Sequence, residues 1–290
     1  HRIVQGAEVF SETTLVTDEV IDKIDELAEL APVHNHAHAL ALRACKKVFD
    51  SSVPQAVVFD TAFHQTMPPK AYMYGIAYQD YVKYHVRKYG FHGTSHRFVS
   101  MALAKAMGKD LKDLKIVSCH LGNGSSITAI ENGKSIDTSM GFTPLAGVMM
   151  GTRCGDVDPS IMPYLCKKLN KTPDEILDIY NKKSGMLGIS GISSDSRDIE
   201  NALFKNGDER ALLTGLLYAR IVSKYIGSYF VEMGGVDAIA FTAGVGENAS
   251  YLRRLIIDNV SRALGVFLNE EENERRSKDC LLYTSDAADE

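Results

Sequence analysis

The sequence of 290 residues is long enough for about two domains with buried cores. Its formal net charge of −5, with no basic cluster of more than a few residues, disfavours nucleic acid and anionic membranes as partners. The five cysteines are widely spaced without a CxxC pair, and the chain has neither a signal-peptide pattern nor an apolar run of roughly 18 residues, so we expect a cytoplasmic protein.

Short strands and helices alternate over the first part of the chain. His1–Gly6 has the pattern of a strand that enters a loop, and Thr17 caps an amphipathic helix that Pro32 ends. A second helix carries apolar residues on one side up to Phe49, and the compact run Gln55–Phe59 predicts a buried strand. This order is typical of an α/β unit.

Asp60 directly follows the predicted strand. Open α/β sheets bind ligands beyond the carboxyl ends of their strands, so this carboxylate is a candidate to hold Mg²⁺ or to orient a substrate oxygen. Aspartates at strand ends also cap turns, and this alternative stays open. The stretch Thr61–Ala71 contains two adjacent prolines and little periodicity, which predicts a domain crossover nearby.

A helix and a β-hairpin are predicted in the middle of the chain. The tyrosine-rich segment Tyr72–Tyr89 fits strands and helices equally, whereas Ser95–Met107 predicts an amphipathic helix that ends at Gly108. Beyond it, Lys115–Cys119, 126–130 and 134–138 predict strands, and Asn132-Gly133 has the composition of a two-residue hairpin turn.

The loop between the first two of these strands has the composition of a phosphate-binding loop. We expect Gly122 and Gly124 to adopt positive φ and to bring amide groups near an anion, while Asn123, Ser125 and Ser126 add uncharged donors. A glycine-rich turn without a ligand is the alternative from this loop alone.

Helices dominate after the irregular segment 140–158. They are predicted over residues 159–168 and 172–181, and a long one runs from Asp208 to Met233. A buried strand, Ala238–Thr242, then leads through a glycine loop into a helix that starts near Ser250 and whose N-terminus we expect to face an anion. Mixed strands and helices in this order predict an α/β fold.

Three loops, at residues 120–126, 194–197 and 244–248, have compositions that suit a nucleotide, and their recurrence favours a nucleotide site, although the glycine loop 244–248 alone is more typical of a tight turn. Arg2 and Arg153 stand beside glycine-rich backbone. A guanidinium group can clamp a carboxylate or a transferring phosphoryl group, and a structural ion pair is the alternative for each.

Histidines gather in residues 34–38 and 92–96. On helices, the first and last histidine of each group would share a face, so a zinc site is an alternative, which we disfavour because no cysteine or carboxylate lies at the usual spacing. His92 is a better candidate to donate a hydrogen bond to a developing phosphoryl charge.

In this order, the motifs resemble the acetate kinase family of acyl-phosphate-forming kinases from His1 to about Cys280. The motifs that carry the resemblance are His1–Val4, Val57–Pro69, Arg87–His96, His120–Ser126, Met140–Pro144, Met150–Gly155 and Phe241–Asn248. The resemblance implies an actin/Hsp70/sugar-kinase (ribonuclease H-like) α/β fold whose two domains close over ATP, with Mg²⁺, in a homodimer. It also implies reversible, in-line phosphoryl transfer from ATP to acetate, which yields ADP and acetyl phosphate.

The resemblance also implies roles for individual residues. Asp60, His92 and Arg153 fall on catalytic positions, and Arg2 brackets the substrates together with Arg153. The pocket for the acetate methyl group is implied at Val4, Val33, Phe91 and Pro144. The implied nucleotide-binding residues are His120, Leu121, Gly122, Asn123, Gly124, Asp195, Ser196, Arg197, Gly244, Val245, Gly246, Glu247 and Asn248. A carboxylate substrate is already ionised at neutral pH and needs no general base, so we interpret Asp60 as a metal-binding or positioning group and assign no dedicated metal ligand.

Compared with the family pattern, the chain is expected to be a fragment. Residues 1–62 are predicted to be the remainder of an N-terminal acetate-side domain, residues 63–280 the nucleotide-binding domain, and residues 281–290 an unmatched tail. Gln5-Gly6-Ala7 stands where His-Gly-Gly is common, and an N-terminal phosphate loop and a C-terminal Asn-Glu-Glu segment are missing, so we expect weak nucleotide binding and slow or no turnover. A propionate or butyrate kinase, a non-catalytic nucleotide-binding switch of the actin or Hsp70 kind, and an inert truncated product are the alternatives.

Overall fold

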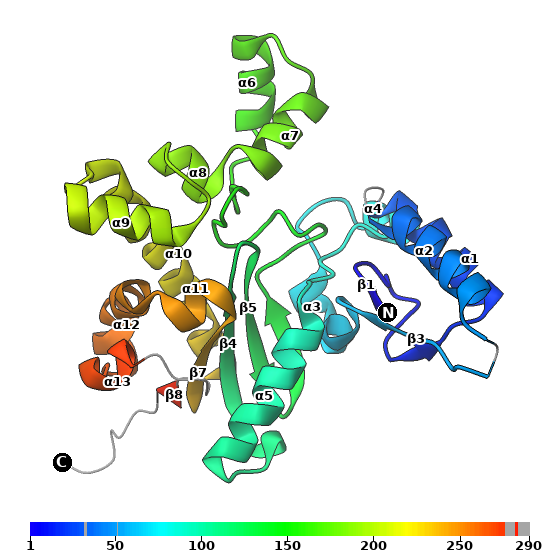
Figure 1. The fold of residues 1–290 in the computed structure, drawn as a ribbon, viewed down its shortest axis with the longest axis horizontal. Coiled ribbons are helices and arrows are strands. Elements are labelled where there is room, and N and C mark those ends of the chain that lie inside the picture. Colours follow the sequence, from blue (N-terminus) through cyan, green and yellow to red (C-terminus); the bar gives the residue numbers. More distant parts are fainter. Residues whose placement is uncertain (32–33, 51, 276–281, 284–290) are drawn as a thin grey trace.

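The structure, a computed structural model, describes residues 1–31, 34–50, 52–275 and 282–283 and contains two sheets (Figure 1). The small sheet has the order β1 (Arg2–Ile3), β3 (Ala56–Phe59) and β2 (Thr14–Leu15). The larger sheet has the order β6 (Lys134–Thr138), β5 (Ser125–Glu131), β4 (Lys115–Leu121), β7 (Ala238–Thr242) and β8 (Leu282–Tyr283).

The larger sheet is mixed, and its parallel pair positions the site. β4 pairs antiparallel with β5 and parallel with β7, with His120 opposite Thr242. Because β4 and β7 run in the same direction, the segments that follow them leave the sheet at the same edge.

Two helices pack beside the small sheet, α1 (Asp18–Glu26) and α2 (Asn35–Val48), with the 3₁₀ turn η1 (Leu27–Glu29) between them (Figure 1). The hydroxyl of Thr17 accepts a hydrogen bond from the Val20 amide, which confirms the predicted cap. Buried Ile21, Ile24 and Leu42 from these helices pack against Val57 and Phe59 of β3. The apolar residues that are spaced at helical intervals in the sequence therefore form one small core with the strand.

Helices cover both faces of the larger sheet (Figure 1). On one face, Val99 and Leu103 of α5 (Gly93–Met107) pack with Ile116 and Ile130. On the other, α10 (Glu209–Met233) and α12 (Ser250–Leu264) belong to the largest apolar cluster of the structure, together with the side chains of Val117, Cys119 and Leu121. Alternate residues of β4 therefore face opposite helix layers. The other helical elements are η2 (Ala62–Thr66), α3 (Pro69–Tyr72), α4 (Tyr78–Tyr84), η3 (Leu111–Asp113), α6 (Ile161–Leu169), α7 (Pro173–Lys182), α8 (Gly185–Ser190), α9 (Ser196–Asn206), α11 (Ala243–Asn248) and α13 (Glu270–Glu274).

Several local expectations are confirmed and others are wrong. Helix α5 ends at Gly108 as predicted, and Asn132 and Gly133 adopt the positive φ values of a tight hairpin turn, 54° and 74°. Gly122 and Gly124 lack the predicted positive φ, and the Gly122 amide donates to the Gly124 carbonyl across the loop, 3.1 Å away, so it is not free for an anion. Residues 243–248 form the short helix α11, not a loop.

The predicted boundaries after residues 62 and 280 stay predictions. Of the predicted tail, the structure describes only Leu282–Tyr283, which pairs with β7 as an edge strand. Within the described ranges, no helix combines the length and the apolar character that crossing a membrane requires.

Candidate active site

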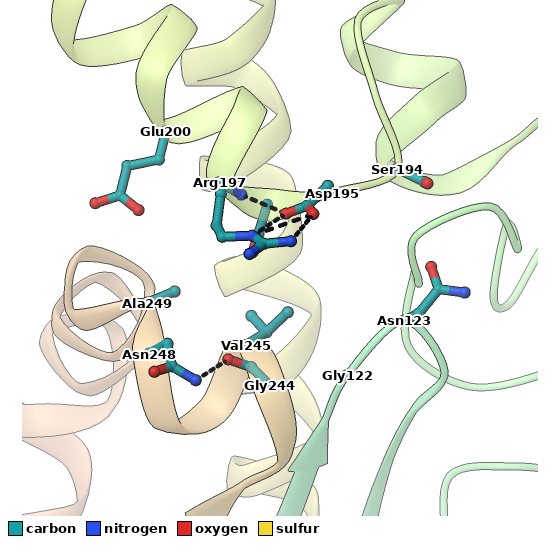
Figure 2. Close-up of a pocket in the computed structure, with 11 residues that line it drawn as sticks. Gly122, Asn123, Ser194, Asp195, Arg197, Glu200, Gly244, Val245, Asn248 and Ala249 are labelled. Atoms are coloured by element: carbon teal, nitrogen blue, oxygen red, sulfur yellow. Dashed lines mark hydrogen bonds and ion pairs between the residues drawn. The ribbon is translucent and has the colours of Figure 1, made fainter. Parts of the chain in front are cut away.

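Segments that are far apart in the sequence line one cavity of about 700 Å³ at the edge where β4 and β7 end (Figure 2). Its size falls within the usual range for small-molecule sites. The loop after β4, the start of α9 and the segment after β7 contribute the lining residues, which are Gly122, Asn123, Ser194, Asp195, Ser196, Arg197, Glu200, Gly244, Val245, Asn248 and Ala249. The recurring loops of the sequence therefore meet at one site.

The start of α9 forms a polar wall of this cavity. Asp195 caps the helix by accepting a hydrogen bond from the Arg197 amide, 2.9 Å away, and the guanidinium group of Arg197 pairs with the same carboxylate (Figure 2). This pairing lowers the pKa of Asp195 to about 2. At neutral pH the wall therefore carries a compensated pair of charges rather than a free cation.

The remaining residues predicted to bind nucleotide lie around the cavity without lining it. Leu121 is buried in the sheet, and the α-carbon of Gly246 faces Leu121 and Phe241, so both pack beneath the site. The Glu247 carboxylate accepts a hydrogen bond from the Ala243 amide, 3.0 Å away, at the start of α11.

Arg253 supports this wall of the cavity through hydrogen bonds to α11, a role that the local sequence does not predict. Its buried guanidinium group donates to the carbonyl oxygens of Gly246 and Glu247, both 2.9 Å away. Its position on α12 carried no local signal, because the contact depends on how α12 packs under α11.

Arg2 and Asp60 form a bidentate ion pair at the ends of β1 and β3. The Nε and Nη2 atoms of Arg2 lie 2.8 and 2.6 Å from the two carboxylate oxygens of Asp60. The Asp60 side chain is only 4% exposed, whereas that of Arg2 is 65% exposed, and the carboxylate raises the pKa of Arg2. Asp60 thus holds one edge of the Arg2 guanidinium group and positions the rest of it.

His92 lies close to both arginines. It is the N-cap residue that precedes α5, in a left-handed conformation with φ 58°, and its Nδ1 atom hydrogen-bonds with the Ser126 hydroxyl at 2.8 Å. Burial, the neighbouring His120 and the positive charges of Arg2 and Arg153 lower the pKa of His92 to about 3. The imidazole is therefore neutral at pH 7, so it can offer a hydrogen bond but cannot compensate negative charge as a cation.

Arg153 is a cation without a carboxylate partner among the residues that the structure describes. Its Nη1 atom donates to the Pro144 carbonyl oxygen at 3.1 Å, and burial lowers the pKa of its guanidinium group. A Cβ atom placed on Gly124 would lie 3.5 Å from His92 Nε2 and 3.7 Å from Arg153 Nη1. Gly122, in the same loop, lines the cavity, so the cavity and the His92–Arg153 pair adjoin at this loop.

An apolar cluster lies beside Arg153. Phe91, Met140 and Met150 are buried together, and Val4 packs against them. The Met150 sulfur lies 3.9 Å from Arg153 Nη1. Of the residues implied for the acetate pocket, Val4 and Phe91 therefore share one cluster, and the Pro144 carbonyl holds the arginine next to it, whereas Val33 lies outside the described residues.

The acetokinase family profile matches residues 1–289. The chain belongs to the acetokinase family. It is 54% identical to the acetate kinase of Thermoanaerobacterium thermosaccharolyticum over 99% of this chain and 71% of the relative. The crystal structure of Porphyromonas gingivalis acetate kinase superposes with a TM-score of 0.92 at 44% identity, over 98% of this chain and 71% of that one. A propionate kinase from Francisella tularensis superposes with a TM-score of 0.89 at 43% identity, over 94% of this chain and 70% of that one. The predicted α/β fold is thereby confirmed as that of acetate and propionate kinases.

For this acetokinase family member, the structure also adds residues to the proposed site. Glu200 and Ala249 line the cavity beside Ser194 of the predicted loop 194–197. Two buried side chains, His96 and Ser118, connect to His92 through Ser126. The i, i+4 spacing of His92 and His96 is the sequence signal for this connection, although the same spacing also suits a zinc site. Within the described part of the chain, no group of at least three His, Cys, Asp or Glu side chains could hold a metal ion.

Proposed function

We propose that the chain catalyses the reversible phosphorylation of acetate by ATP to give acetyl phosphate and ADP. The observation that supports this proposal best is the loop 122–124, which lines the nucleotide-sized cavity on one side and approaches His92 Nε2 and Arg153 Nη1 on the other. A nucleotide in the cavity would extend its terminal phosphate past this loop toward both donors.

The substrate carboxylate would lie near Arg2 and Arg153, with its methyl group toward Val4 and Phe91. One carboxylate oxygen attacks the γ-phosphorus, the bond from phosphorus to the bridging oxygen breaks, and ADP leaves with the electron pair. The barrier to this reaction comes mainly from charge repulsion between the two anions, and fixed donors along the in-line path lower it. The neutral imidazole of His92 contributes one N–H, and Arg153 contributes positive charge.

Asp60 has a positioning role in this mechanism. Acetate is already ionised at pH 7, so no base is needed, and both Asp60 oxygens accept hydrogen bonds from Arg2. The pair keeps the guanidinium group oriented before the substrate arrives, which reduces the cost of organising the site.

The Asp60 carboxylate, near Arg2 and the proposed phosphoryl position, fits a Mg²⁺ ion that is bound mostly by the nucleotide. Mg²⁺ in kinases takes one or two protein carboxylates and otherwise phosphate oxygens and water. The Asp60 carboxylate has lone pairs beyond the two that Arg2 uses, so it would serve as such a ligand. When bound, the ion neutralises charge on the phosphates.

Hydroxylamine trapping tests the proposed reaction. The protein is incubated with ATP, Mg²⁺ and acetate, propionate, butyrate or no carboxylate, and the acyl hydroxamate and released phosphate are measured. We expect hydroxamate that depends on both ATP and acetate. Phosphate release without hydroxamate would instead identify a nucleotide-binding switch, and a higher kcat/KM for propionate or butyrate would reassign the substrate.

The domain division, the homodimer and the cytoplasmic location belong to the same proposal. Cys45, Cys119, Cys154 and Cys166 are free thiols, as expected in a reducing compartment.

Sedimentation equilibrium measures the oligomeric state, and a monomer at micromolar concentration would contradict the homodimer. Limited proteolysis that cuts near residue 62 and leaves a stable C-terminal part would support the division.

A further inference from the structure

A row of hydrogen-bonding side chains runs from the cleft into the interior beneath α5. Ser118 Oγ lies 2.9 Å from His96 Nδ1, His96 Nε2 lies 2.8 Å from Ser126 Oγ, and Ser126 Oγ lies 2.8 Å from His92 Nδ1. Ser118, His96 and Ser126 are fully buried. Side chains from β4, α5 and β5 therefore join His92 to the core without solvent.

Counting protons leaves two consistent arrangements for this row. Burial and the neighbouring histidines lower the pKa of His96 well below its ordinary value, so its ring carries one N–H, and each serine carries one O–H. Either every group donates toward the cleft, or every group donates away from it. Any other arrangement places two protons, or none, between one pair of atoms, or lets the Ser126 oxygen accept from both histidines, which leaves the Ser126 proton buried without an acceptor among the described residues.

Ser118 decides between the two arrangements. Among the described residues, its hydroxyl has no hydrogen-bond partner other than His96 Nδ1. If His96 donated to Ser118, the Ser118 proton would be buried without an acceptor, which is unfavourable. Ser118 therefore donates to His96, which donates through Nε2 to Ser126.

The last step of the row sets the proton of His92. Because the Ser126 hydroxyl accepts from His96, its own proton goes to His92 Nδ1, and the ring proton of the neutral His92 must reside on Nε2. This is the atom near Gly124 and Arg153. The left-handed φ of His92 and its ring contact with His120, 4.2 Å between centroids, hold the imidazole in this orientation.

We propose that Ser118, His96 and Ser126 are positioning residues that fix the tautomer of His92, so that a neutral imidazole donates its Nε2 proton to the transferring phosphoryl group. The inference rests on the proposed phosphoryl transfer for its purpose, but the tautomer itself follows from the hydrogen bonds alone. The same row in the opposite direction would present a lone pair of Nε2 to the phosphate oxygens and would repel them.

The tautomer is measurable without turnover, by nitrogen NMR of protein with ¹⁵N-labelled histidine. His92 is assigned by its disappearance in His92→Gln. We expect Nε2 protonated and Nδ1 unprotonated in the parent protein, and a mixture of tautomers in Ser118→Ala and Ser126→Ala. The matched control is Ser100→Ala, which removes a different buried hydroxyl, on α5, that donates to the Arg97 carbonyl oxygen. It should leave the tautomer and the transfer rate unchanged.

Kinetics separate a positioning role from a structural one. Loss of such a supporting contact typically costs on the order of 10- to 100-fold, so we expect Ser126→Ala and His96→Leu to lower kcat by this factor with KM for ATP within about twofold. His96→Gln retains a donor at the Nε2 position and should recover most of the rate relative to His96→Leu. Thermal melting of each variant identifies any that fail to fold. If one does, the conclusion is drawn from Ser118→Ala, which is the smallest change.

The outcomes of the two proposals are distinguishable. Protonation of His92 at Nδ1 in the parent protein, or an unchanged tautomer in Ser118→Ala, would contradict the proposed direction of these hydrogen bonds even if acetyl phosphate forms. Protonation of His92 at Nε2 without any acyl hydroxamate would support the proposed hydrogen-bond direction and would contradict the proposed reaction.

Discussion

Gly124 lies between the two groups that face the proposed phosphoryl position, so Gly124→Ala tests their role directly. The added methyl carbon would lie 3.5 Å from His92 Nε2 and 3.7 Å from Arg153 Nη1, which are ordinary van der Waals distances. The φ of Gly124 is also outside the positive range that penalises alanine. We therefore expect the free energy of unfolding to stay within about 1 kcal/mol of the parent, since alanine at a compatible position usually stabilises slightly.

The same methyl group occupies the space that the phosphoryl oxygens need in order to reach both donors. Loss of one preorganised donor typically lowers a rate by about 10²- to 10³-fold, so transfer by Gly124→Ala should slow at least about 100-fold, or about 2.7 kcal/mol in activation free energy. Nucleotide affinity should change by less than about threefold, because Gly124 does not line the cavity. The assay is single-turnover transfer, with the protein in excess over ATP labelled in its γ-phosphate and with saturating acetate. Calorimetric ADP binding and urea unfolding are measured on the same samples.

Gly227→Ala is the matched control for this experiment. Gly227 lies within α10, and no atom lies within 4 Å of its added Cβ. This variant should transfer at the parent rate and gain up to about 1 kcal/mol in stability. Transfer by a well-folded Gly124→Ala at the parent rate would refute the convergence of His92 and Arg153 on the phosphoryl group.

The remaining predictions concern the charged and buried side chains. Arg153→Ala should lower the transfer rate by about 100-fold while the Kd for ADP stays within twofold, because the guanidinium group compensates charge on the transferring group; parent-rate turnover would disprove this role. Asp60→Asn removes the carboxylate that holds Arg2, so KM for acetate should rise about tenfold in steady-state assays, and an unchanged KM would argue against positioning. Burial lowers the pKa of His64 from 6.5 to about 4, so between these pH values the unfolded chain binds a proton that the folded protein does not. Stability should therefore fall as pH decreases from 6.5 toward 4, by about 1.4 kcal/mol per pH unit for this group, and urea unfolding of His64→Gln should show a shallower pH slope than the parent; equal slopes would contradict the assignment.

Local sequence signals predicted much of the fold. Thr17 and Gly108 marked real helix ends, and Asn132-Gly133 formed the expected turn, because caps and tight turns depend on neighbouring residues. The same local reasoning was wrong about Gly122, whose amide bonds across its own loop, and about residues 243–248, which form a short helix. The Gly122 hydrogen bond is local, whereas α11 is held by a tertiary contact, because Arg253 of α12 donates to the carbonyl oxygens of Gly246 and Glu247.

For the site, the sequence alone determined which residue types were available: the glycine loops, two arginines beside glycines, a strand-end aspartate and paired histidines. Only the tertiary structure decided which of them meet. The parallel pairing of β4 with β7 brings together loops about 120 residues apart, β1 and β3 join Arg2 to Asp60, and α5 lays His92 and His96 over Ser126 and Ser118. The protonation of His92 depends on these contacts, because the pKa and tautomer of a buried imidazole are set by the groups that surround it in space and not by its neighbours in sequence.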